Sequence, residues 1–194
     1  MVVKFEPFIA SALFSQPRGR IRFNVPVQLS LLPECQLPMS FALRLHHATT
    51  RHFDLRLRVL QTLFSLVLLG DPSLDPAKPV RAKLMGDHDP RYIDSERKIP
   101  EGQPGAGPTM PVDLGGFAPI LRTYSTYELE TLDQISRGDF QFTLTGRHLK
   151  GGWQLQRGQG DYWDFQKMDD EHASTSRVLV LDRSFKTGKT LEEI

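Results

Sequence analysis

The stretch FALRLHHATTRHFDLRLRV, residues 41–59, contains two segments in which apolar and polar side chains alternate with period two. Successive side chains of a β-strand point to opposite faces of the sheet, so this alternation predicts two half-buried strands, at residues 41–46 and 52–59. The five residues between them, 47–51, are few enough to close an antiparallel hairpin. In such a hairpin His46 lies roughly opposite His52.

The same alternation recurs along the chain. We expect further strands at residues 80–84, 140–145, 153–155 and 163–167, with a turn at residues 157–160 joining the last two into a hairpin. Many short strands joined by turns that contain glycine or proline are typical of a sheet that closes on itself or folds into a sandwich. The fold class is therefore predicted to be mainly β.

One helix is indicated between these strands. Ser125 and Glu128 have the spacing of a capping box, apolar residues follow at helical intervals, and Gly138 stands where a helix typically ends. We divide the chain into an irregular N-terminal extension (residues 1–39, punctuated by five prolines), a β domain (residues 40–168), and a polar C-terminal tail or linker (residues 169–194).

Composition excludes several classes of protein. The chain has 194 residues, with 24 Lys and Arg against 23 Asp and Glu, so its formal net charge is +1 and a nucleic-acid partner would need a local basic patch. The lone cysteine, Cys35, excludes a disulfide scaffold within one chain and a cysteine-rich zinc site. The longest apolar stretch, residues 59–69, is interrupted by polar residues and is too short to span a membrane. We therefore expect a cytoplasmic protein with no membrane partner.

The predicted hairpin gathers the residues that could carry chemistry. Opposed residues of an antiparallel pair have Cβ atoms about 5 Å apart, and period two places Asp54 and Arg56 on the same face as His52. Two imidazoles and a carboxylate suit Mn²⁺, Fe²⁺ or Zn²⁺, and an adjacent arginine suits a phosphate. The competing interpretation is an ordinary solvated strand face. However, Lys and Glu, the usual solvent-facing residues, are missing from this face.

Two other segments give weaker signals. His88 follows the predicted strand at residues 80–84, and the glycine-rich stretch 99–107 predicts tight turns that could approach a phosphate. His52, Asp54 and His88 could instead form the two-histidine, one-carboxylate triad of non-haem iron oxygenases. That alternative leaves His46 and Arg56 without a role.

The segment from His46 to Leu57 resembles the His-x5-His-x-Asp-x-Arg-Leu signature of the 3′-phosphoesterase module of bacterial DNA ligase D. Further blocks resemble the same family in the same order over residues 41–194: Pro72-Ser73-Leu74-Asp75-Pro76, Asp87-His88 with Tyr92, Ile99-Pro100-Glu101-Gly102 with Gly105-Ala106-Gly107, Leu149 to Trp153, Trp163 to Lys167, and Thr187 to Ile194.

This resemblance implies a compact closed β-barrel with one or two short helices, and a Mn²⁺-dependent hydrolase that removes 3′-phosphates and 3′-terminal ribonucleotides from DNA or RNA-tailed DNA ends. By position, it implies the following site residues: His46, His52 and Asp54 as metal ligands, Arg56 on the phosphate, and His88 and Tyr92 as catalytic residues. Arg44 and Ser65 complete the set of candidate substrate-binding residues.

The sequence also departs from the family pattern. Gly70 stands where the family carries a lysine, Gly86 where it carries a glutamate, and residues 1–39 have no counterpart of its N-terminal segment. These departures keep open an alternative function, a catalytically weakened module that binds DNA ends. The sequence contains no lysine motif for nucleotidyl transfer, so a separate DNA ligase or end-binding protein is the candidate partner.

Overall fold

A computed structural model describes residues 39–86, 88–124 and 126–194. The irregular extension expected at residues 1–39 therefore lies outside the described residues, except for Met39. Within the described ranges the chain forms nine strands, one α-helix and two short 3₁₀ helices.

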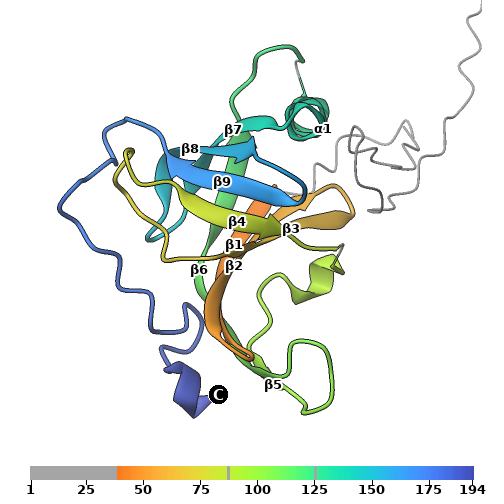
Figure 1. Cartoon of the computed structure of the whole chain (residues 1–194), viewed down its shortest axis with the longest axis vertical. Helices are drawn as coiled ribbons and strands as arrows, with labels where there is room; N and C mark the ends of the chain where they lie inside the picture. Colours follow the sequence, from red (N-terminus) through yellow and green to blue (C-terminus); the bar gives the residue numbers. More distant parts are fainter. Residues whose placement is uncertain (1–38, 87, 125) are drawn as a thin grey trace, which may run out of the picture.

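Eight of the strands close into an antiparallel barrel (Figure 1). The hydrogen-bonded order is β1-β2-β3-β4-β9-β8-β7-β6, and β6 pairs back onto β1; the short β5 adds to the outer side of β6. The bounds are β1 Ser40–His47, β2 Arg51–Val59, β3 Thr62–Leu68, β4 Val80–Leu84, β5 Arg97–Ile99, β6 Gly107–Pro119, β7 Asp139–Thr145, β8 Lys150–Arg157 and β9 Tyr162–Lys167. The predicted closed β-barrel is confirmed.

The register of β1 and β2 decides which side chains enter the core. Phe41 pairs with Leu57, Leu43 with Leu55, and Leu45 with Phe53, and these six side chains are buried in one hydrophobic cluster. The intervening side chains point away from that core. Among them His46 lies directly opposite His52, as the sequence predicts.

The outward face of β1 and β2 is largely covered by another part of the chain. Residues 88–106, here called the cover segment, contain the 3₁₀ helix η1 (Pro90–Tyr92) and β5, and they hydrogen-bond to side chains on this face. As a result Arg44 is only 1% exposed, although its side chain points away from the barrel core. The polar face of the hairpin is thus sandwiched between the barrel and the cover segment.

The C-terminal residues hold the cover segment in place. Ser184 and Thr187 hydrogen-bond to the carboxylate of Glu96, and Lys186 forms an ion pair with Asp94 at 3.0 Å. Leu181 and Leu191 join the hydrophobic core, the latter from η2 (Leu191–Glu193). Residues 169–194 thus contact both the hydrophobic core and the cover segment. The boundaries proposed for the three segments stay a prediction.

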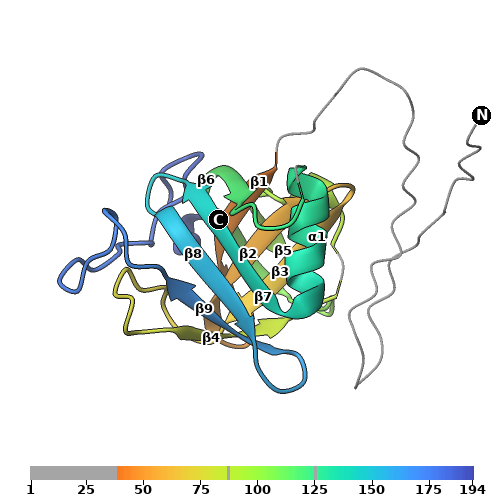
Figure 2. The ribbon, with the colours of Figure 1, turned by 90° about the horizontal axis from the view of Figure 1, so that it is seen from above.

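Helix α1 (Tyr127–Arg137) packs against β7 (Figure 2). Gly138 ends it in the left-handed conformation, as predicted. The start differs from the prediction: Ser125 lies outside the described residues, and the N-cap is Thr126, which makes no side-chain capping bond. In the described residues, no helix is long and apolar enough to span a membrane.

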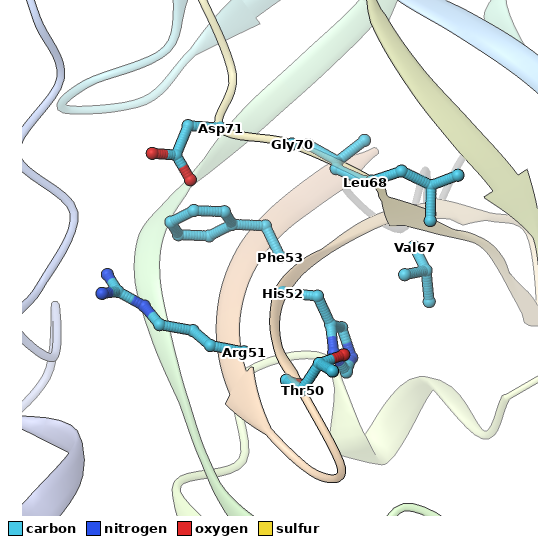
Figure 3. Close-up of a pocket in the computed structure, with 9 residues that line it drawn as sticks. Thr50, Arg51, His52, Phe53, Val67, Leu68, Gly70 and Asp71 are labelled. Carbon is cyan, nitrogen blue, oxygen red and sulfur yellow. The ribbon is translucent and has the colours of Figure 1, made fainter.

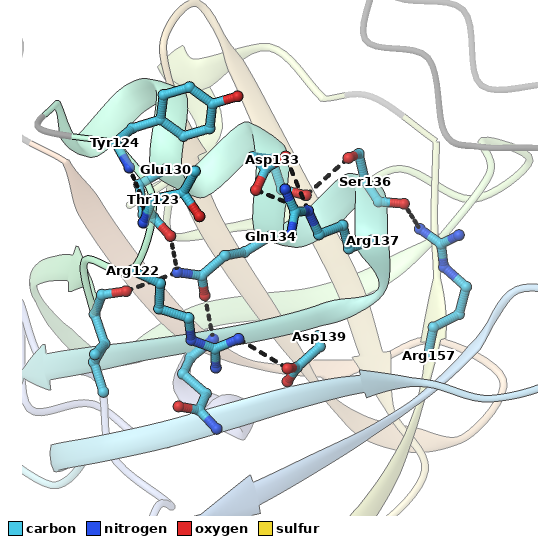
Figure 4. A network of polar contacts seen from close by, with 12 residues as sticks. Arg122, Thr123, Tyr124, Glu130, Asp133, Gln134, Ser136, Arg137, Asp139 and Arg157 are labelled. Carbon is cyan, nitrogen blue, oxygen red and sulfur yellow. Dashed lines mark hydrogen bonds and ion pairs between the residues drawn. The ribbon is translucent and has the colours of Figure 1, made fainter.

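Glu130 is the residue that fixes the first turn of α1 (Figure 4). Its Oε2 accepts hydrogen bonds from the backbone amides of Thr123 and Tyr124, at 2.8 and 2.6 Å, and its Oε1 accepts from Gln134 Nε2. Gln134 continues the network by donating to the carbonyl of Ile120 and accepting from the amide of Gln141. Burial alone would raise the pKa of Glu130, but these hydrogen bonds outweigh it and lower the pKa to about 2.

Glu130→Gln should therefore destabilise the fold by about 1–3 kcal/mol at neutral pH, because the buried charged acceptor of two backbone amides is lost. The wild-type carboxylate contributes stability above its ordinary pKa of 4.5, and this contribution is lost as the pH falls towards 2. The difference in unfolding free energy between wild type and variant should shrink over that window in urea titrations. Glu128→Gln, at a partly exposed position of the same helix with no side-chain hydrogen bond of this network, is the control and should have little effect.

Candidate metal centre

Three side chains with metal-binding atoms converge on the outward face of the β1–β2 hairpin. His46 Nδ1 lies 3.8 Å from Asp54 Oδ2, and His52 Nε2 lies 3.5 Å from Asp54 Oδ1. The two imidazole rings meet edge to face, with centroids 4.8 Å apart. One ligand atom from each residue lies within 4.8 Å of the other two. The triad expected from strand geometry is therefore assembled.

The remaining ring nitrogen of each histidine contacts a backbone carbonyl. His46 Nε2 lies 2.8 Å from the oxygen of Gly105, and His52 Nδ1 lies 2.9 Å from the oxygen of Thr50. A carbonyl only accepts, so in the neutral rings these two nitrogens carry the protons. The lone pairs of His46 Nδ1 and His52 Nε2 then face Asp54. Partners of this kind orient histidine ligands in metal sites.

Glycine suits position 105, whose carbonyl orients His46, for a steric reason. Its φ of 74° lies in the left-handed region, and a Cβ there would lie 3.3 Å from an imidazole carbon of His46. A side chain at this position would therefore strain the backbone and crowd the ring. The sequence indicated tight turns in this glycine-rich stretch, but not that one of them contacts a candidate metal ligand.

Charges around the triad favour an ionised Asp54. Burial raises its pKa, but the neighbouring His52, Arg56 and His46 outweigh burial, and the net shift is downward. Burial lowers the pKa of His46, whereas the hydrogen bond to Asp54 raises that of His52. Two oriented imidazoles and an ionised carboxylate form a donor set that Mn²⁺, Fe²⁺ and Zn²⁺ all accept. These residues fit a divalent metal.

Two arginines lie beside the triad and contact the cover segment. Arg56 lies 3.7 Å from Asp54 and donates to the carbonyl of Tyr92 at 2.9 Å. Arg44 donates to Thr109 Oγ1 at 2.9 Å and to the carbonyl of Ile93 at 3.2 Å. Burial, reinforced by the charge of Arg56, lowers the pKa of Arg44 to about 10. A substrate could contact Arg44 directly only if the cover segment moved.

The other predicted site residues lie around the same face. Ser65 on β3 is buried and stands directly opposite Arg56 in the β2–β3 register. His88 forms an isolated bridge with Leu63, two residues before Ser65 on the same strand. The carbonyl of Tyr92 accepts the hydrogen bond from Arg56. The centre of its ring lies 4.7 Å from the guanidinium carbon of Arg97. The triad in the described residues contains His46 and not His88, unlike the iron-oxygenase alternative.

A family model described as "DNA Ligase D 3′-phosphoesterase domain" matches residues 44–157, which include all of these side chains. The chain belongs to this family. The resemblance noted in the sequence is thereby confirmed.

Curated proteins of the same family align with most of the chain. The multifunctional non-homologous end joining protein LigD of Pseudomonas aeruginosa is 32% identical over 148 residues, covering 74% of this chain and 17% of that protein. The LigD proteins of Mycolicibacterium smegmatis and Mycobacterium tuberculosis are each 29% identical, covering 68% and 64% of this chain and 17% and 15% of their own lengths. The chain thus spans about a sixth of the length of the curated relatives it matches.

A pocket that the sequence did not predict adjoins the phosphoesterase-family triad (Figure 3). It has a volume of about 290 Å³, and His52 forms part of its wall. The other lining residues come from the start of β2 and from the end of β3 and its following turn: Thr50, Arg51, Phe53, Val67, Leu68, Leu69, Gly70 and Asp71. The predicted metal ligand His52 therefore faces both the triad and a space large enough for part of a substrate.

Metal binding can be measured without any substrate. Mn²⁺ at a hundred times its dissociation constant should raise the unfolding free energy by about 2.7 kcal/mol, because the unfolded chain lacks the assembled triad. His46→Ala, His52→Ala and Asp54→Ala should each abolish most of this gain in thermal unfolding. His172→Ala, which removes a partly exposed histidine outside the site, should retain it. Full stabilisation of any triad variant would contradict the assignment.

Proposed function

We propose that the domain is a metal-dependent 3′-phosphoesterase that heals DNA ends for non-homologous end joining. It removes a 3′-phosphate or a 3′-terminal ribonucleotide and so prepares a 3′-hydroxyl for ligation. Family membership supports the reaction class. The observation that carries the proposal is the convergence of His46, His52 and Asp54, with both imidazole lone pairs facing the carboxylate, beside the guanidinium of Arg56.

The proposed cofactor is Mn²⁺, held by His46, His52 and Asp54. When bound, such a cation acts as a Lewis acid towards a phosphoryl oxygen and lowers the pKa of a bound water. The oriented imidazoles are important here because a ligand that need not reorganise loses less entropy on binding. The carbonyls of Gly105 and Thr50 provide that orientation.

Arg56 is proposed to neutralise the charge on the phosphoryl group. Its guanidinium already lies next to the triad, and its present partner is the neutral carbonyl of Tyr92. A phosphoryl oxygen is a stronger acceptor than a neutral carbonyl, since both partners then carry charge and the guanidinium can bind two phosphoryl oxygens at once. Ser65, across the strand pair from Arg56, is proposed to donate its hydroxyl hydrogen to another phosphoryl oxygen in place of its present acceptor, the carbonyl of Leu63.

His88 is proposed as the proton donor. In hydrolysis of a 3′-phosphate, water forms the new bond to phosphorus, the bond from phosphorus to the 3′ oxygen breaks, and that oxygen must gain a proton. A protonated imidazole can supply it. Tyr92 is proposed to contribute through its position on the cover segment beside Arg56.

The substrates we propose are DNA and RNA-tailed DNA 3′ ends, with a separate DNA ligase or end-binding protein as partner. Because the proposed substrates are ends of chromosomal DNA, we propose that the domain acts in the cytoplasm. An alternative function, end binding without turnover, draws support from the pocket wall: Gly70 and Asp71 provide no cation there. A primer that ends in a 3′-phosphate distinguishes the two functions, because only an esterase releases phosphate from it.

Arg56→Ala should lower phosphate release from such a primer by about 10²–10³-fold with Mn²⁺ present, because one electrostatic donor to the transition state is lost. Metal stabilisation of the folded protein should persist, since Arg56 is not a ligand. Arg58→Ala is the matched control, two residues further along the same face of β2, and should change the rate less than about threefold. Binding of the primer by the wild-type protein without phosphate release would instead establish the end-binding alternative.

A further inference from the structure

We propose that the outward face of β2, β3, β4 and β9 binds the terminal nucleotide of a single-stranded 3′ end in one fixed direction. The 3′-phosphoryl group lies at the triad, the nucleoside lies in the pocket beside His52, and the 5′-phosphodiester group lies on Arg81 and Lys83. This proposal rests on the proposed function and names its substrate subsite.

The strand register sets this order. Asp54 pairs with Val67, Val67 with Lys83, and Lys83 with Tyr162, so one row of neighbouring residues runs from the triad across the sheet. In the adjacent row the amide of Leu69 donates to the carbonyl of Arg81. All of these side chains face outward, because the residues between them in the sequence, such as Leu68 and Ala82, are buried in the core.

The spacing of the strands matches the length of a single nucleotide. Neighbouring strands lie about 4.8 Å apart, so the backbone of Lys83, two strands away from Asp54, lies about 10 Å from it. A lysine side chain extending back from that distance can reach the far end of a nucleotide bound at the triad. The strand that lies between them, β3, is where the pocket opens.

The chemistry of the pocket suits an uncharged nucleoside. Val67 and the exposed Leu69 provide an apolar surface for a base or sugar, and Thr50 provides a hydroxyl group. Asp71 also lines the pocket, where Figure 3 shows its carboxylate beside the ring of Phe53, and this charge disfavours a phosphate in the same place. The phosphate groups of a bound nucleotide should therefore lie on either side of the pocket.

Beyond the pocket, β4 provides the positive charge. Arg81 and Lys83 are exposed and lie two residues apart on the same face. The guanidinium of Arg81 lies 4.8 Å from the centre of the Tyr162 ring, although Asp164 is its direct neighbour in the β4–β9 register. Tyr162 remains 37% exposed. A basic pair beside an accessible aromatic ring is typical of surfaces that bind single-stranded nucleic acid.

Two small ligands test the direction of binding. A nucleoside 3′,5′-bisphosphate carries both phosphate groups, and a nucleoside 3′-monophosphate lacks the 5′ group. In calorimetry with Mn²⁺, on protein that also carries His88→Ala so that the proposed proton donor is removed and the ligands stay intact, replacing both Arg81 and Lys83 by alanine should weaken binding of the bisphosphate about threefold to tenfold, in line with exposed charge pairs. Binding of the monophosphate should stay unchanged. Lys150→Ala, an exposed lysine on β8, is the control.

A second variant tests the pocket. Val67→Phe fills it from the outward face of β3 without entering the core, and Thr143→Phe places the same ring on an exposed position of β7 as a control. Val67→Phe should weaken both nucleotides more than tenfold and leave the binding of inorganic phosphate unchanged. The proposal is overturned if the Arg81 and Lys83 double variant affects both nucleotides equally or neither, or if Val67→Phe weakens inorganic phosphate as well. Because these are binding measurements, they remain decisive even if no phosphate is released and the proposed catalytic function fails.

Discussion

The antiparallel pairing of β1 with β2 is the constraint on which both the core and the candidate site depend. Leu45 pairs with Phe53 inside the barrel, and one residue further along His46 pairs with His52 outside it. Because side chains alternate with period two, a slip of one residue would move the core residues to the surface and the triad into the core. The large free-energy cost of exposing the core leucines and phenylalanines therefore also fixes the relative position of the imidazoles.

This arrangement costs free energy because it buries charged side chains. Arg44, Asp54 and much of Arg56 are removed from water between the barrel and the cover segment, and a buried charge is tolerated only where it is paired or hydrogen-bonded. The cover segment provides the carbonyls of Tyr92 and Ile93 for this purpose. It is itself held by the C-terminal residues through Glu96 and Asp94. Residues distant in sequence thus keep the polar face dry enough for its charges to interact strongly.

Sequence patterns predicted the parts of the molecule that depend on local alternation. They predicted the hairpin and the opposed histidines, which follow from the two-residue period of side chains along a strand. They also predicted the end of α1 at Gly138, which follows from the backbone conformation of one residue. They did not predict β6, whose prolines and glycines are unusual in a strand and are accommodated by a register shift against β1 between Leu43 and Arg44. The burial of Arg44 and the contact of Gly105 with His46 also escaped prediction. Both depend on where a distant segment folds back, and alternation along one strand carries no information about that.

The contacts of Arg56 suggest how the site would serve the proposed function, both before and after a phosphate binds. A mostly buried guanidinium beside a carboxylate needs acceptors at all times, and here Asp54 and the carbonyl of Tyr92 provide them. A divalent cation at the triad would draw on the charge of Asp54 and so weaken its attraction for Arg56. With a weaker ion pair to Asp54, the guanidinium would bind a phosphoryl oxygen more readily. That oxygen would replace the neutral carbonyl of Tyr92 as its hydrogen-bond acceptor. Occupation of the triad would in this way prepare Arg56 for the substrate, with no movement of the barrel strands that hold both.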